Sequence, residues 1–289
     1  MNKSEVRSII HEHGLHPNKA LGQNFLISNA VRDRIIDTIG LIRADSVLEV
    51  GPGLGALTEP LTGAAGMVTA VEIDSGFCRF LAKHFSDRKN FRLVHADFLK
   101  ASIEGSFTKI VSNLPYYCSS EILFKILQYD APAAYLMLQK EMAERIVSGP
   151  GQKAYGALTV TLSLYYEPVI LFSVPRQAFY PQPEVASSFL SLCRRGSLAL
   201  KRDDIAIFHR LVKSAFWGRR KMIRTALSES PHLRAGREWA GRILDEAGIN
   251  GRSRGEELGL DDYIALVRAY KKIRLNKKQD SWQDWIVKQ

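Results

Sequence analysis

The residues best equipped for chemistry lie in the segment 110–117, which reads Ile-Val-Ser-Asn-Leu-Pro-Tyr-Tyr. Apolar residues there run directly into an amide side chain, a proline and two aromatic rings. Asn113 can accept hydrogen bonds from an exocyclic amine, and Tyr116 can stack against a planar ring. These residue types indicate a site that holds a nucleobase by its edge and its face. The competing interpretation is a strand closed by an Asn-x-Pro turn, with Tyr117 packed in the core.

A glycine-rich segment follows a short β-rich run at residues 46–50 and indicates a nucleotide site. It reads Gly51-Pro52-Gly53-Leu54-Gly55, and a helix is expected to open at residue 57 or 58. A strand, a glycine loop and a helix in this order begin a doubly wound sheet, where the backbone can approach a ligand closely. Glu72 lies within the next predicted strand, 68–74, 21 residues after Gly51. At about that offset an acidic side chain reaches ribose hydroxyls.

The remaining periodicity predicts an α/β fold with further strands. These strands are expected at 91–96, 109–112, 133–138, 169–174 and 185–193. Asp97 follows the first of them and Asn113 the second, so both lie at carboxyl ends of strands, where open α/β sheets bind ligands. Residues 155–165 fit a strand or a helix, and the helix is favoured. Near the N-terminus, Ser4 is expected to cap a short amphipathic helix.

The positive charge of the chain is confined to its last third. The 289 residues have a formal net charge of +10. Residues 1–193 carry 18 Lys and Arg against 18 Asp and Glu, whereas residues 194–289 carry 22 against 12. A cationic region beside a neutral one predicts two regions, of which the second binds a polyanion. Nucleic acid is favoured over a basic surface that serves solubility alone.

The cationic region has a helical pattern. Helices are predicted over 205–227, 237–247 and 261–272, and the first of them carries Arg219, Arg220 and Lys221. We therefore expect a catalytic domain over residues 1–195, a basic helical RNA-binding domain over 196–275, and a C-terminal tail over 276–289.

Composition also indicates the cellular compartment. The three cysteines are widely spaced and form no CxxC pair, which predicts a reducing compartment and no structural metal. The sequence shows no signal peptide and no apolar span of about 18 residues that could cross a membrane. We expect a soluble cytoplasmic protein, a monomer, with no membrane partner.

The type of nucleotide is open on the glycine loop alone. Gly51, Gly53 and Ala56 satisfy the dinucleotide pattern, so an NAD-dependent enzyme is a competing hypothesis that a nicotinamide titration would test. Glu49 makes the approach to the loop acidic, which suits a cation better than a pyrophosphate. S-adenosylmethionine has a cationic sulfonium, one ribose for Glu72 and one adenine amine for Asp97. These features favour S-adenosylmethionine.

Eight short motifs occur in order along the chain: Lys19-x-x-Gly22-Gln23-Asn24-Phe25-Leu26, Glu49-Val50-Gly51-Pro52-Gly53-x-Gly55, Val71-Glu72-Ile73-Asp74, Ala96-Asp97-Phe98, Asn113-Leu114-Pro115-Tyr116, Leu138-Gln139-Lys140-Glu141, Phe179-Tyr180-Pro181-Gln182-Pro183 and Phe216-x-x-Arg219-Arg220-Lys221. Together they resemble the bacterial small-subunit ribosomal RNA adenine dimethyltransferases, the kasugamycin-sensitivity family, over roughly residues 10–270. The macrolide-resistance methyltransferases of large-subunit RNA share several of these motifs. The arginine-rich segment after Phe216 and the longer basic C-terminal region favour the small-subunit family.

This resemblance implies a Rossmann-like seven-stranded methyltransferase sheet with a small C-terminal α-helical domain. It also implies that S-adenosylmethionine, the methyl donor, is contacted by Asn24, Leu26, Gly51, Glu72, Asp97 and Asn113. Residues 1–27 would form an N-terminal flap that folds over this cofactor. Without the resemblance, the segment 19–26 would equally be interpreted as a structural loop.

The resemblance further implies N6,N6-dimethylation of two adjacent adenines in a 3′-terminal hairpin loop of 16S rRNA, coupled to biogenesis of the small subunit. Asn113 and the Leu114 carbonyl would accept the hydrogens of the adenine amine. Tyr116 and Phe179 would hold the flipped base between two aromatic faces. Arg219, Arg220 and Lys221 would bind RNA phosphates. The alternatives are a large-subunit methyltransferase and a ribosome-assembly factor whose binding role dominates.

Overall fold

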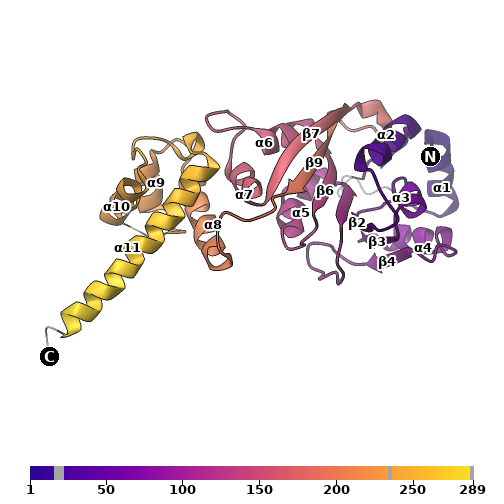
Figure 1. The fold of residues 1–289 in the computed structure, drawn as a ribbon. Coiled ribbons are helices and arrows are strands. Elements are labelled where there is room, and N and C mark those ends of the chain that lie inside the picture. The colour runs from indigo at the N-terminus through magenta and orange to yellow at the C-terminus, as the bar shows by residue number, and fades with distance from the viewer. Residues whose placement is uncertain (16–22, 234–235, 287–289) are drawn as a thin grey trace. The chain divides into compact units, whose positions relative to one another are not determined.

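The computed structural model describes residues 1–15, 23–233 and 236–286, with residues 275–286 described by their backbone alone (Figure 1). Lys19 and Gly22 of the first motif, part of the predicted flap and the end of the predicted tail therefore lie outside the described residues. The chain divides into two compact units. The sheet unit comprises Met1–Glu144 and Glu167–Arg194, and the helical unit comprises Arg145–Tyr166 and Arg195–Gln289.

The sheet unit contains a mixed seven-stranded sheet, as predicted. Its strands are β2 (Ser46–Val50), β3 (Met67–Glu72), β4 (Phe91–His95), β5 (Lys109–Asn113), β6 (Ala133–Gln139), β7 (Tyr166–Val174) and β9 (Ser187–Arg194). They are arranged in the order β4-β3-β2-β5-β6-β9-β7. The pairs from β4 to β6 are parallel, and β9 runs antiparallel to β6. Strand β6 reads as an apolar run as far as Leu138 because helices cover both faces of the sheet.

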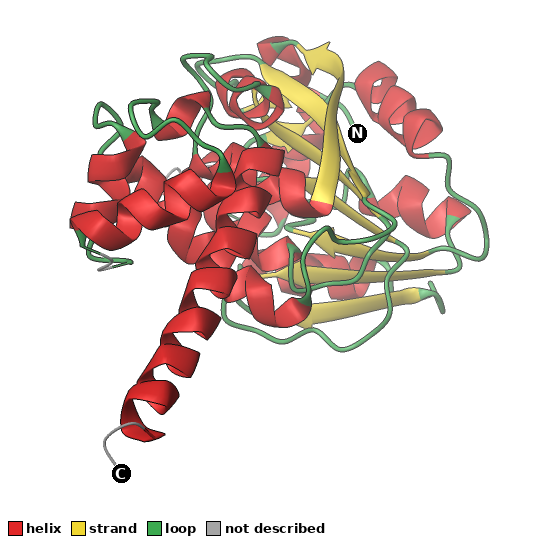
Figure 2. Ribbon diagram, turned by 60° about the vertical axis from the view of Figure 1, so that its left-hand side comes forward, coloured by secondary structure: helices red, strands yellow, loops and turns green. Residues whose placement is uncertain are grey.

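The strand order reverses between β2 and β5, and this reversal places the site. Helices α3 (Thr58–Ala64) and α4 (Ser75–His84) lead outward from β2 to β3 and β4. Helix α5 (Ser119–Ile126) leads from β5 to β6 in the opposite direction. Figure 2 shows the strands in yellow with red helices beside them. Right-handed crossovers therefore put α5 on the other face of the sheet from α3 and α4. The loops after β2 and β5 consequently diverge at their carboxyl ends and leave a crevice for a ligand.

One buried cluster joins α2 (Asn29–Ile39) and α3 to the sheet. It includes Ile35, Ile39, Leu61, Val47, Val68, Val111 and Phe189. Ser28 caps α2 by accepting a hydrogen bond from the Val31 amide (3.3 Å), and Gly40 ends it in the left-handed conformation at φ 59°. The capping residues Ser28 and Gly40 therefore begin and end α2 at positions that let its apolar face pack in this cluster.

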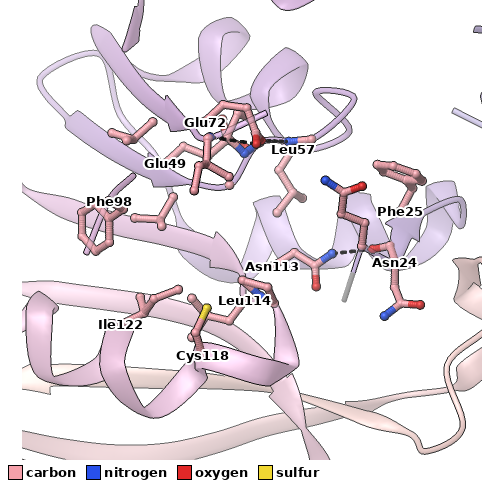
Figure 3. Close-up of a pocket in the computed structure, with 18 of the residues that line it drawn as sticks. Asn24, Phe25, Glu49, Leu57, Glu72, Phe98, Asn113, Leu114, Cys118 and Ile122 are labelled. Atoms are coloured by element: carbon pink, nitrogen blue, oxygen red, sulfur yellow. Dashed lines mark hydrogen bonds between the residues drawn. The ribbon is translucent and has the colours of Figure 1, made fainter. Parts of the chain in front are cut away.

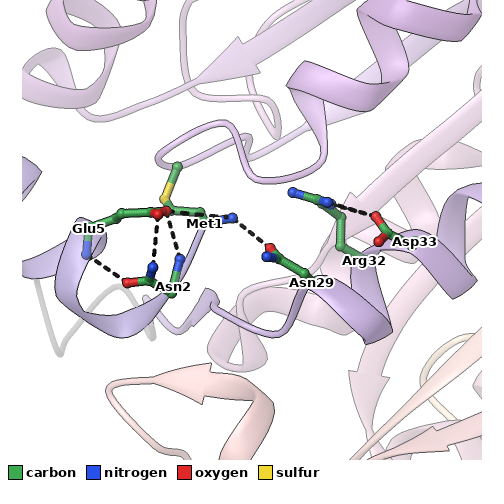
Figure 4. A network of polar contacts seen from close by, with 6 residues as sticks. All are labelled: Met1, Asn2, Glu5, Asn29, Arg32 and Asp33. Atoms are coloured by element: carbon green, nitrogen blue, oxygen red, sulfur yellow. Dashed lines mark hydrogen bonds and ion pairs between the residues drawn. The ribbon is translucent and has the colours of Figure 1, made fainter.

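The first helix, α1 (Lys3–Glu12), begins two residues earlier than expected. Asn2 is its cap, not Ser4, because the Asn2 side chain accepts from the Glu5 amide while the Glu5 carboxylate accepts from the Asn2 amide. This capping box satisfies two amides that Ser4 would leave without partners. The Met1 amino group donates to Asn29 Oδ1 (2.7 Å) and ties α1 to α2 (Figure 4).

A second, two-stranded sheet was not predicted. It pairs β1 (Phe25–Leu26) with β8 (Phe179–Tyr180) in antiparallel register. A two-residue strand is too short to show a periodic sequence pattern. It is recognised only from its pairing with a strand that is distant in the sequence. This pairing fixes the segment that includes Asn24 next to the main sheet.

The helical unit contains α7 (Ala157–Tyr165), α8 (Arg202–Trp217), α9 (Ile223–Glu229), α10 (Arg237–Ala247) and α11 (Leu260–Ile286). A short 3-10 turn covers Gly255–Glu257 in this unit, and two others cover Tyr116–Cys118 and Arg176–Ala178 in the sheet unit. Helix α6 (Lys140–Val147) precedes α7.

The prediction of a single helix over 205–227 is wrong. Helix α8 ends at Trp217, the Lys221 amide bonds to the Gly218 carbonyl (2.7 Å), and α9 restarts at Ile223. None of the helices among the described residues is both long enough and apolar enough to cross a bilayer.

The predicted domain boundary at residue 195 coincides with the division after Arg194, but residues 145–166 group with the C-terminal helices. Helix α7 is buried on nearly all of its faces, which requires neighbours all around it. Tyr155 also donates its hydroxyl to the Leu258 carbonyl (2.8 Å). Sequence order alone placed this segment with the sheet.

A buried carboxylate joins two parallel strands at their amino ends. Asp45 precedes β2 and is 5% exposed. It accepts hydrogen bonds from the Ile42 amide (2.9 Å), the Thr108 hydroxyl (2.7 Å) and the Lys109 ammonium (2.6 Å). Burial alone would raise the pKa of Asp45, but these hydrogen bonds outweigh it and lower the pKa.

We expect Asp45→Asn to lower the free energy of unfolding at pH 7 by about 2 kcal/mol, because it removes the charge that Lys109 faces. The folded-state pKa of Asp45 is lowered, so its contribution is fully present above the unfolded value of about 3.9 and is lost as the pH falls further. Urea unfolding at several pH values measures both effects. Asp130→Asn is the control, because Asp130 is 96% exposed in its ion pair with Arg194. Equal losses in the two variants, or a loss for Asp45→Asn that is as large at pH 3 as at pH 7, would contradict this assignment.

Candidate functional site

One pocket gathers all the residues predicted to contact the cofactor. Asn24, Leu26, Gly51, Glu72, Asp97 and Asn113 all line it. Figure 3 labels Asn24, Glu72 and Asn113 among them. They come from β1 and from the carboxyl ends of β2, β3, β4 and β5, which are far apart in the sequence but adjacent in the fold. With the solvent space at its open mouth included, the pocket contains about 1100 Å³.

The glycine loop after β2 forms one wall. Gly51 and Gly53 have φ values of 69° and 57°, in the left-handed region that favours glycine. The Gly51 amide bonds to the Val71 carbonyl (2.9 Å), which holds the loop against β3. A Cβ atom on Gly53 would lie 3.3 Å from the Phe25 ring. The loop and β1 therefore approach each other closely because a side chain is absent here.

Glu72 ends β3 with its carboxylate held by backbone amides. One oxygen accepts from Ile73 and Asp74 (both 2.9 Å), and the other accepts from Gly53 (3.0 Å). Burial raises the pKa of Glu72, and these three hydrogen bonds oppose that rise. Each carboxylate oxygen can accept more than one hydrogen bond, so the group retains capacity for ligand hydroxyls.

Burial alters the charge that the sequence suggests for Glu49. Glu49 lies in β2, lines the pocket and is 2% exposed. Burial, opposed by a hydrogen bond from Thr58 (2.7 Å) and reinforced by the charge of Glu72, raises the pKa of Glu49 to about 8. At neutral pH its carboxyl is therefore largely protonated and does not make the loop acidic. A sequence cannot reveal this, because the pKa depends on burial.

An apolar slot lies beside Asp97. Asp97 accepts a hydrogen bond from the Leu99 amide (3.0 Å) and pairs with Lys100 (3.3 Å). Phe98 and Ile122 line the adjacent part of the pocket (Figure 3). Sequence reasoning did not assign either residue to the site. Phe98 belongs to the Ala96-Asp97-Phe98 motif, which was a usable signal, whereas none of the eight motifs includes Ile122.

Asn113 ends β5 in a fixed orientation. Its Nδ2 donates to the backbone carbonyl of Asn24 (2.9 Å), as Figure 3 shows. An amide whose nitrogen is engaged in this way has its Oδ1 atom as the acceptor. Leu114 follows with its amide bonded to the Met137 carbonyl of β6 (3.0 Å). Of the two predicted acceptor residues, Asn113 is thus held by the backbone of Asn24 and Leu114 by strand β6.

The three aromatic residues predicted near the site have different environments. Tyr116 lines the pocket, and its hydroxyl lies 2.6 Å from the Ser187 hydroxyl, which holds its ring in place. Tyr117 also lines the pocket and is 55% exposed, so the core packing considered for it is wrong. Phe179 is 2% exposed and belongs to the buried cluster that contains Leu26, so the structure does not bring it into the pocket wall. The register of β8 with β1 places it there.

Arg219, Arg220 and Lys221 lie in the helical unit, in the turn between α8 and α9. Arg219 donates to the Glu256 carboxylate (2.8 Å) and to the Lys153 carbonyl. The Lys221 ammonium lies 2.5 Å from a Glu229 oxygen. Arg220 is exposed and makes no ion pair within the described part of the chain. These three cations therefore differ in their availability to a ligand.

Comparisons with known proteins agree with this site. The model of the family described as ribosomal RNA adenine dimethylase matches residues 14–266. The chain is 36% identical over 276 residues to the ribosomal RNA small subunit methyltransferase A of Geobacillus thermodenitrificans, a match that covers 91% of this chain and 94% of that protein.

Two solved structures extend the similarity to the fold. A dimethyladenosine transferase from Plasmodium falciparum has a TM-score of 0.76 at 25% identity, covering 86% of this chain and 98% of that one. The 23S rRNA methyltransferase ErmE has a TM-score of 0.66 at 28% identity, covering 86% of this chain and 100% of that one. The predicted family resemblance and the predicted α/β methyltransferase fold are confirmed. The chain therefore belongs to the ribosomal RNA adenine dimethylase family, whose members use S-adenosylmethionine as methyl donor.

Proposed function

We propose that this chain transfers methyl groups from S-adenosylmethionine to N6 of two adjacent adenines in a 3′-terminal hairpin loop of small-subunit rRNA. The observation that carries the proposal is the Asn113 side chain, whose Nδ2 is bonded to Asn24 while Oδ1 has acceptor capacity at the pocket. The family match supports the adenine target, and the name of the relative with 36% identity supports the small subunit. We further propose that the protein acts in the cytoplasm as a monomer, during small-subunit biogenesis.

The pocket has the groups that this cofactor requires. S-adenosylmethionine supplies a methyl group that is activated by the positive sulfonium. The Glu72 carboxylate would accept hydrogen bonds from ribose hydroxyls, and Asp97 from the adenine amine. Phe98 and Ile122 would lie along the adenine ring, and Gly51 would let the backbone approach the ligand. Asn24 and Leu26 would close the pocket from β1.

The acceptor residues would activate the target amine by positioning it. The lone pair of an adenine amine is delocalised into the ring, which makes the amine a poor nucleophile. If Asn113 Oδ1 and the Leu114 carbonyl accept its two hydrogens, the lone pair can localise toward the methyl group. Preorganised acceptors of this kind need no strong general base. Tyr116 would hold the flipped base by stacking, which contributes about 1–3 kcal/mol. Because the Phe179 ring is buried, the proposal does not depend on it.

The large-subunit alternative rests on the similarity to ErmE, at a lower TM-score than the dimethyladenosine transferase. Incubation with labelled S-adenosylmethionine and purified undermethylated subunits distinguishes the two targets. We expect label in the small subunit, with modified adenines mapped to one hairpin loop. Label in the large subunit alone would refute the small-subunit assignment. The assembly-factor alternative predicts that a catalytically inactive variant still supports subunit maturation.

We expect Asn113→Ala to lower the rate of methyl transfer at saturating cofactor by about 100-fold or more, the loss typical of one preorganised polar contact. Binding of RNA should remain. Asn113→Asp separates the two functions of the amide, because it retains acceptor oxygens but loses the donor to Asn24. Asn90→Ala is the matched control, since Asn90 donates to the Thr62 and Ala65 carbonyls away from the pocket. A variant Asn113→Ala that binds cofactor and RNA and transfers methyl groups at the parental rate would refute the mechanism.

Replacing Arg219, Arg220 and Lys221 together with Ala should weaken RNA binding and reduce its dependence on salt. The slope of log affinity against log salt should fall by about 0.7–0.9 for each phosphate contact that is lost. Cofactor affinity, measured by calorimetry, should not change. Replacement of Lys83, Arg88 and Lys89, three exposed cations of the sheet unit, serves as the control. Loss of cofactor binding in the first variant would instead indicate a structural role for the cluster.

A further inference from the structure

An exposed tryptophan lies directly beside the basic cluster. Trp217 ends α8 and is 44% exposed. Neither the methyl-transfer mechanism nor the phosphate contacts proposed above use its indole ring. A tryptophan that keeps this much apolar area in contact with water, among cations, is typical of a binding surface.

The chain folds back on itself around this ring. The Lys221 ammonium lies 4.6 Å from the centroid of the Trp217 ring, in cation–π contact. A Cβ atom on Gly218 would lie 2.8 Å from the Lys221 side chain, so the absent side chain gives the lysine its path back to the ring. The Glu229 carboxylate holds the same ammonium. The indole is thus fixed by one neighbour while much of its surface stays exposed.

A second segment is bridged to the turn that follows Trp217. Met222 and Arg254 form an antiparallel bridge, so their side chains leave the backbone on the same side. Met222 is 48% exposed, and Arg254 and Arg220 are exposed without an ion pair among the described residues. We call Trp217, Arg220, Lys221, Met222 and Arg254 the Trp217 patch.

We propose that the Trp217 patch binds an unpaired base of the ribosomal RNA, with the base stacked on the Trp217 indole and its flanking phosphates at Arg220 and Arg254. This inference rests on the proposed function, because it takes rRNA as the substrate. Positive charge around an exposed aromatic ring fits single-stranded RNA, in which every base offers a π-face and every nucleotide a negative phosphate. The patch is a subsite separate from the pocket that would receive the target adenine, since all of its residues belong to the helical unit.

A stacking residue and a phosphate-binding residue differ in their response to salt. Stacking releases no counterions, whereas neutralising a phosphate does. Trp217→Ala should therefore weaken binding to undermethylated small subunits by about 5-fold to 150-fold, the range for one lost base stack, without changing the salt slope. Arg220→Ala should lower the slope. Trp217→Phe should retain most of the affinity, and Trp217→Leu should not, because leucine is apolar but not aromatic.

Controls separate stacking from a structural role. Phe124→Ala removes another aromatic side chain that is 44% exposed, from α5 in the sheet unit, and should leave the affinity unchanged. At saturating subunit concentration, Trp217→Ala should transfer methyl groups at the parental rate and show only a raised KM. If this variant is unstable, intrinsic fluorescence tests the parental protein directly. The chain has four tryptophans, and RNA should quench the parental emission more than that of Trp217→Phe.

Three results would overturn the inference. The first is unchanged affinity of Trp217→Ala at every salt concentration. The second is equal affinity of Trp217→Phe and Trp217→Leu. The third is a loss of affinity for whole subunits but not for deproteinised rRNA, which would assign the patch to a ribosomal protein. None of these results affects methyl transfer by the parental protein. If the parental protein methylates no rRNA, it is the proposed function that fails.

Discussion

The hydrogen bond from Asn113 Nδ2 to the Asn24 carbonyl is the contact on which the site depends. An amide side chain can present either its donor or its acceptor to a ligand, and this bond selects the acceptor. It is available only because β1 lies at the end of β5, held by its ladder with β8 and by the fit of the Phe25 ring over Gly53. A short segment near the N-terminus therefore determines the chemistry of a residue almost ninety positions later.

The electrostatics of the pocket follow from burial more than from composition. Glu49 and Glu72 lie on neighbouring strands, and burial raises the pKa of both. Two buried carboxylates close together disfavour double ionisation, and here the two have different partners. Glu72 has three backbone amides, whereas Glu49 has one hydroxyl and a pKa of about 8. The negative charge at neutral pH is thus expected at Glu72, where strand β3 ends, and not at the base of the glycine loop.

The order of elements could be predicted from the sequence, because strands buried on both faces and helices with one apolar face have clear periodicity. The six residues proposed to contact the cofactor line one pocket, and they could be selected from the sequence because each occurs in a motif or at a strand end. The β1–β8 ladder could not be predicted, since two-residue strands have no pattern. Nor could the burial of Phe179, which depends on that ladder, or the break after Trp217, where the helical periodicity continues across Gly218. Each of these features depends on contacts between residues distant in sequence.

The sheet unit and the helical unit differ in net charge, and their interactions therefore depend differently on salt. The sheet unit has 17 basic and 18 acidic residues, so its net charge is close to zero. Its pocket acts through fixed dipoles and a few oriented acceptors, which salt screens little. The excess positive charge lies in the remaining residues, and its long-range attraction for a polyanion weakens as salt rises. Affinity for RNA and the rate of the chemical step should therefore respond differently to ionic strength. An aromatic stack beside the cations would add affinity that salt does not remove, and it would favour unpaired bases over duplex, which exposed lysines and arginines alone do not.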